Sequence, residues 1–101
     1  MNIKINGKDV KLEYTFNSFK YMEDFDINEM KDIETKPFKM VKMTETLLLG
    51  ALNNNPKNVY TLEDVETFLE EYVIENSISK FIEELIGLLQ DSNFFKSLQN
   101  Q

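Results

Sequence analysis

Two groups of acidic residues have a spacing that could support chemistry. The first is Asp24, Asp26 and Asn28, which alternate as the first ligands of a calcium-binding loop do. The pattern then fails, because Glu29 occupies the position where glycine makes the turn and Thr35 the position of the bidentate glutamate. We therefore predict a solvated helix end here and no metal site.

The second group is the glutamates between residues 63 and 75, where paired carboxylates could act as general acid and base. Their spacing follows one helix face, and no histidine or lysine stands among them, which is typical of a solvated helix surface. The chain has no cysteine and no histidine, so the usual thiolate and imidazole nucleophiles and zinc sites are excluded. We predict no enzyme activity, no metal and no cofactor.

The charge is distributed unevenly along the chain. Residues 1–60 contain nine acidic residues and nine lysines, whereas residues 61–101 contain nine acidic residues against Lys80 and Lys96. The net charge of −7 therefore lies in the C-terminal part, and no arginine is present to contact phosphate or base edges. We expect no nucleic-acid partner.

The longest apolar run of the central segment, Leu47 to Leu52, has six residues, where a membrane helix requires about 20. We expect no membrane partner. The N-terminal residues MNIKIN are polar and do not indicate a secretory leader, so the expected location is the cytoplasm.

The length of 101 residues indicates one domain, 1–101. In residues 1–15, apolar and polar residues alternate around Asn6-Gly7, which predicts a β-hairpin with Ile3 opposite Val10. Such a hairpin is marginal in water and needs a helix against its apolar face. We predict a mainly α (α+β) fold in which this hairpin packs on a small bundle of about four to five helices.

Residues 16–91 are predicted to form that bundle. A helix of two or three turns begins at Phe16, residues 26–36 form a short helix or an ordered loop, and Pro37 opens a helix that stops at Asn53-Asn54-Asn55. Thr61 and Ser77 are expected to cap two more helices. Each of the last three helices has a set of residues predicted to face inward. For the helix that begins at Pro37 they are Met40, Met43, Thr44, Leu47, Leu48, Ala51 and Leu52; for the helix capped by Thr61 they are Leu62, Val65, Phe68, Leu69, Tyr72 and Val73; and for the helix capped by Ser77 they are Ile78, Phe81, Ile82, Leu85, Ile86 and Leu89.

Four apolar residues do not fit these stripes and are the candidates for partner binding. Leu49 points away from the inward side of its helix, so either both sides of that helix are covered or Leu49 is an exposed contact. Phe94, Phe95 and Leu98 lie in the predicted C-terminal tail, residues 92–101, and dock either on the core or on another chain. For the second case we expect Phe94→Ala with Phe95→Ala to keep the fold and to weaken partner binding.

The chain as a whole resembles a known family. The segments IKINGKDVKLEY, LLLGALNNN and TLEDVETFLEEY, in this order and spacing, are similar to those of tail assembly chaperones of long-tailed (siphovirus-type) phages and prophages of low-GC Gram-positive bacteria. The resemblance implies a protein that binds the tape measure protein, keeps it soluble and helps recruit the major tail (tube) protein. It also implies action in the host cytoplasm and absence from the mature virion.

Two other functional classes remain as alternatives to this one. The first is a small acidic prophage protein-binding module or regulator with no tail role. The second is an acidic mimic of nucleic acid, which would need carboxylates in a phosphate-like array, whereas here they follow helix periodicity. Self-association of the chain is left open.

Overall fold

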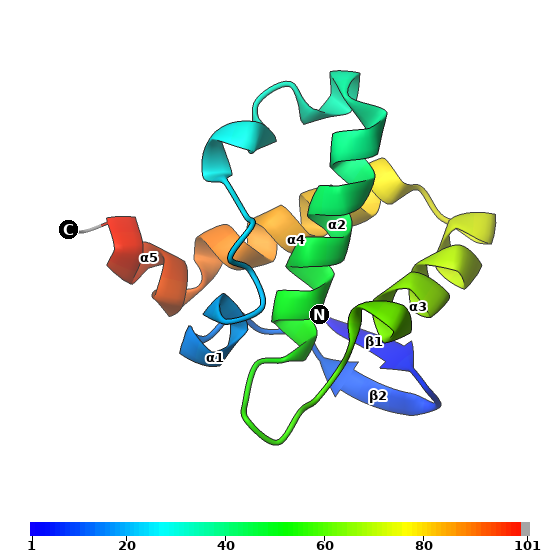
Figure 1. Ribbon diagram of the computed structural model, residues 1–101, viewed down its shortest axis with the longest axis horizontal. Helices are drawn as coiled ribbons and strands as arrows, with labels where there is room; N and C mark the ends of the chain where they lie inside the picture. Colours follow the sequence, from blue (N-terminus) through cyan, green and yellow to red (C-terminus); the bar gives the residue numbers. More distant parts are fainter. Residues whose placement is uncertain (100–101) are drawn as a thin grey trace.

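The computed structural model describes residues 1–99, except for the side chains of Ile27 and Gln99. A two-stranded antiparallel hairpin is followed by α-helices and short 3-10 helices, so the predicted mainly α fold with an N-terminal hairpin is confirmed (Figure 1). The elements are β1 Asn2–Ile5, β2 Lys8–Lys11, α1 Phe16–Phe19, η1 Ile27–Met30, η2 Ile33–Thr35, α2 Pro37–Leu52, α3 Leu62–Glu75, α4 Ile78–Asp91 and α5 Asn93–Gln99.

The hairpin has the predicted register, with Ile3 opposite Val10 and Lys4 opposite Asp9. Asn6 and Gly7 have φ angles of 51° and 78°, as a two-residue turn with positive φ at both positions requires. The turn sequence therefore fixes which residues face each other.

Helix α2 lies at the centre of the molecule, and α4 crosses behind it in the view of Figure 1. Pro37 occupies the first turn, where a missing N–H group has no intrahelical role. All seven residues predicted to face inward on this helix are buried. The side of α2 that carries them is thus the main wall of the core.

Helices α3 and α4 begin at the predicted caps. The Thr61 hydroxyl accepts the Asp64 N–H at 3.2 Å while the Asp64 carboxylate accepts the Thr61 N–H at 2.9 Å, which forms a capping box. The Ser77 hydroxyl accepts the Lys80 N–H at 3.3 Å. These bonds satisfy N–H groups that have no partner inside the helix.

The apolar stripe of α3 is only partly covered, which differs from the prediction. Val65 and Leu69 are buried, but Leu62 and Val73 are 49% and 47% exposed. Helix α3 lies at the side of α2 in a molecule only 20 Å thick, so no further layer covers its flank (Figure 1). In contrast, α4 buries Phe81, Ile82, Leu85 and Leu89.

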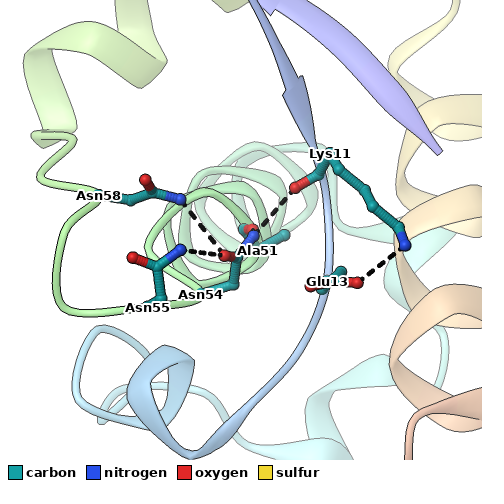
Figure 2. A network of polar contacts seen from close by, with 6 residues as sticks. All are labelled: Lys11, Glu13, Ala51, Asn54, Asn55 and Asn58. Atoms are coloured by element: carbon teal, nitrogen blue, oxygen red, sulfur yellow. Dashed lines mark hydrogen bonds and ion pairs between the residues drawn. The ribbon is translucent and has the colours of Figure 1, made fainter.

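The asparagines after α2 join several parts of the chain. The Asn54 amide donates to the carbonyl groups of Ala51 at 3.0 Å and Lys11 at 2.9 Å, and its oxygen accepts from Asn55 and Asn58 (Figure 2). The buried Asn53 bonds the backbone of Tyr60 in both directions. The predicted helix stop therefore also connects α2 to β2 and to the segment before α3.

Helix α1 ends at Phe19 and is shorter than predicted, while residues 26–36 contain the two 3-10 helices. The Asp26 side chain accepts the Asn28 N–H at 2.9 Å and so caps η1. At the other end of the chain, the segment predicted as a tail forms α5, whose first turn is capped by the Ser92 hydroxyl. Residues 100 and 101 of that segment lie outside the described residues.

Candidate partner-binding surface

The outer side of α2 forms one wall of an apolar groove of about 850 Å³, which we call the α2 groove. Residues of the segment 20–24 and Leu62 at the start of α3 also line the groove. The groove is lined by Lys20, Tyr21, Glu23, Asp24, Phe38, Val41, Lys42, Glu45, Thr46, Leu49 and Leu62.

The part of the groove on α2 is a second apolar stripe, beside the face that packs in the core. Phe38, Val41, Glu45 and Leu49 are separated by three, four and four residues, which places them on one face of a helix. Phe38 is 89% exposed and Val41 is 45% exposed. Helix α2 is therefore apolar on two sides, and only one of them is filled by the protein itself.

Leu49 takes an intermediate position between the two predicted alternatives. It is half-buried, packs against the core on one side and lines the α2 groove on the other. Of the four candidate residues, it is the one that lies in this groove.

Charged residues lie among and beside the apolar residues that line the α2 groove. Glu45 lies within the stripe of α2, and Glu66 lies one turn after Leu62 on α3. Partial burial and the charge of Glu66 both raise the pKa of Glu45 above its ordinary value, while Lys42 lowers it. The two carboxylates therefore repel each other across the space between α2 and α3.

The other three candidate residues line a separate aromatic cavity of about 310 Å³ between α5 and the segment 19–25. Phe94 contacts Phe16 edge-on, with ring centroids 5.5 Å apart, and Phe19 at 6.1 Å. The residues that line this aromatic cavity are Phe19, Met22, Phe25, Leu89, Phe94, Phe95 and Leu98.

Phe94 and Phe95 are buried, at 7% and 6% exposure, and only Leu98 is exposed, at 43%. Both rings thus dock on the core, because α5 folds back against α1 and the end of α4. We therefore no longer expect Phe94→Ala with Phe95→Ala to keep the fold, and expect this double substitution to destabilise it instead. Removing two buried phenyl rings costs about 3 to 5 kcal/mol each, which is a large part of the stability of a small domain.

The segment 19–25 separates the two sites. Tyr21 and Asp24 line the α2 groove, whereas Met22 and Phe25 line the aromatic cavity. Leu49 and the C-terminal candidate residues are therefore not brought together into one surface.

Phe38 and Val41 are the groove residues that the sequence analysis missed. Lys39 lies between them and Lys42 directly follows Val41, so the residues next to each of them in the chain do not show an apolar helix side. The detectable signal is the spacing of Phe38, Val41 and Leu49, which gives a second helical stripe beside the first.

Within residues 1–99, no three acidic side chains converge in an arrangement that would hold a metal ion. None of the helices in this described range combines the length and apolar content that crossing a bilayer requires. No protein-family model, curated protein or solved structure matches the chain.

Proposed function

We propose that this protein is a tail assembly chaperone of a long-tailed phage or prophage. In this role it binds the tape measure protein, keeps it soluble and helps recruit tail-tube subunits. It catalyses no reaction, acts in the cytoplasm of the bacterial host and is absent from the mature virion. The proposal combines the sequence resemblance with one structural observation.

That observation is the uncovered apolar stripe on α2. A side chain such as Phe38, 89% exposed on a regular helix, adds nothing to the core and carries an aggregation liability unless a partner covers it. Grooves of this kind bind amphipathic helices, whose side chains at i, i+3 or i+4, and i+7 enter the groove. Long amphipathic helices are what a tape measure protein presents.

The charge of the chain also suits a protein that keeps an apolar partner in solution. The net charge is −7, and its excess lies in residues 61–101, a range that contains α3, α4 and α5. A high net charge of one sign opposes association between complexes.

Co-expression tests the proposal. The tape measure protein encoded beside this chain is expressed in bacteria with the chain or with an empty vector, and its soluble fraction is measured after centrifugation. We expect the tape measure protein to be soluble and to co-purify with the chain only when both are made. If it stays insoluble while the chain itself is folded and abundant, the role in tail assembly is refuted and a protein-binding module or regulator becomes the better proposal.

A further inference from the structure

The charged side chains that line the α2 groove have a net negative charge. Its lining contains Lys20 and Lys42 against the carboxylates of Glu23, Asp24 and Glu45. Glu66 adds a fourth carboxylate, since its charge acts on Glu45 from α3. A ligand of this groove therefore meets more anionic than cationic groups.

The two carboxylates between α2 and α3 are not neutralised by neighbouring lysines. In the part of the chain that the structure describes, the one ion pair joins Lys11 and Glu13 on the hairpin side, at 3.0 Å. Lys42 acts on Glu45 only at longer range, and Glu66 is exposed. A cation placed near Glu45 and Glu66 would interact favourably with both and would offset their mutual repulsion.

We propose that the α2 groove binds a basic amphipathic helix. The apolar face of this helix covers Phe38, Val41 and Leu49, while Lys or Arg residues on its flank face Glu45 and Glu66. From Phe38 to Leu49 the stripe spans about 16 Å, which corresponds to about three turns of a partner helix. The proposal rests on the proposed function where it names this helix as a segment of the tape measure protein.

The charge of the groove argues against a second copy of this chain as the occupant. The outward faces of α3 and α4 are acidic, with Glu63, Glu70, Glu71, Glu83 and Glu84 exposed. Placing such a face in the groove would bring carboxylates against Glu45 and Glu66. A basic partner has the complementary charge.

Two synthetic peptides of about 18 residues, long enough for the three turns, test the proposal. Both carry the same leucine face and differ only in their flanks, which are lysine in one and glutamate in the other. Their dissociation constants for the full chain are measured by calorimetry at low ionic strength. We expect the lysine peptide to bind at least about tenfold more tightly and to lose this advantage as salt is added.

Two double variants test whether the preference for the lysine peptide comes from Glu45 and Glu66. Glu45→Gln with Glu66→Gln should reduce the preference for the lysine peptide about fivefold, since two partly exposed ion pairs are lost. Glu71→Gln with Glu83→Gln removes the same net charge from exposed positions away from the groove and should leave the preference within about twofold.

Three outcomes would overturn the proposal. Equal binding of the two peptides removes the charge selectivity, and equal loss in both double variants assigns the preference to the net charge of the chain. Binding of neither peptide removes the groove as a helix site. The peptide experiment and the co-expression experiment can fail separately. If neither peptide binds but the tape measure protein stays soluble with the chain, this inference is refuted and the proposed function stands.

Discussion

The side chain of Met22 lies directly against Gly50 of α2, where a Cβ atom at residue 50 would overlap its sulfur and Cγ atoms. The same Met22 lines the aromatic cavity, while its neighbour Tyr21 lines the α2 groove. The missing side chain of Gly50 thus lets the segment between the two sites pack closely on α2.

This contact predicts a change of sign in a double-mutant cycle. Gly50→Ala should lower the free energy of unfolding of the wild-type chain, because Met22 must move out of a filled space. In a Met22→Ala background the same substitution should raise it by up to about 1 kcal/mol, since alanine favours the helix. Urea unfolding of the four proteins measures both values, and the same sign in both backgrounds would show that Met22 does not fill this space.

The aromatic cavity predicts that the C-terminal rings are structural. Phe94→Ala with Phe95→Ala should abolish the cooperative unfolding transition or lower the midpoint strongly, because both rings are buried. Phe38→Ala, at an 89% exposed position, should change the free energy of unfolding by less than about 0.5 kcal/mol. Circular dichroism during heating compares the variants, and a stably folded double variant would place α5 away from the core.

A buried tyrosine connects the hairpin segment to α2. The Tyr14 hydroxyl donates a 2.8 Å hydrogen bond to the carbonyl oxygen of Leu47, and burial raises the pKa of this tyrosine far above its ordinary value. Tyr14→Phe should lower the free energy of unfolding by about 0.5 to 1.5 kcal/mol. Tyr21→Phe is the control, because the Tyr21 hydroxyl makes no hydrogen bond within residues 1–99, and equal effects of the two substitutions would argue against the Tyr14 bond.

The cap of α3 predicts a pH dependence of stability. The Thr61 N–H and the Asn6 amide, which donates to Asp64 at 3.1 Å, lower the pKa of Asp64. Because the folded state holds the ionised form more tightly, this stabilisation is present above the ordinary pKa of aspartate and is lost as the pH falls through the lowered pKa. Asp64→Asn should therefore be less stable than the wild type at neutral pH, with a difference that shrinks in acid.

Urea midpoints between neutral pH and the acid range test this effect. Glu63→Gln, which removes a neighbouring charge outside the capping box, is the control and should show a smaller difference. A constant gap between Asp64→Asn and the wild type across the whole range would contradict the role of Asp64 ionisation.

The parts of the fold that depend on local chemistry could be predicted from the sequence. Asn6-Gly7 specifies a turn with positive φ at both residues, Pro37 marks a helix start, and Thr61 with Asp64 forms a cap within four residues. None of these requires knowledge of the neighbouring elements. The inward face of α2 was also predictable, because its buried residues form one continuous arc at helical spacing.

The parts that depend on tertiary packing could not be predicted in the same way. Leu62 and Val73 have the same helical spacing as the buried Val65 and Leu69, and only the position of α3 beside α2 leaves them exposed. Phe94 is covered by Phe16 and Phe19, which lie more than 70 residues earlier in the chain. No local pattern indicates that α1 and α5 meet.

Capture of the tape measure protein by variants of the α2 groove tests the central claim most directly. Phe38→Ala with Leu62→Ala shortens two exposed groove residues, and Val59→Ala with Ile74→Ala shortens two residues that are 74% and 78% exposed and lie outside the groove. We predict that the first pair reduces the amount of co-purified, soluble tape measure protein at least about tenfold, while the second pair leaves it unchanged. Undiminished capture by a folded groove variant would show that the partner binds elsewhere.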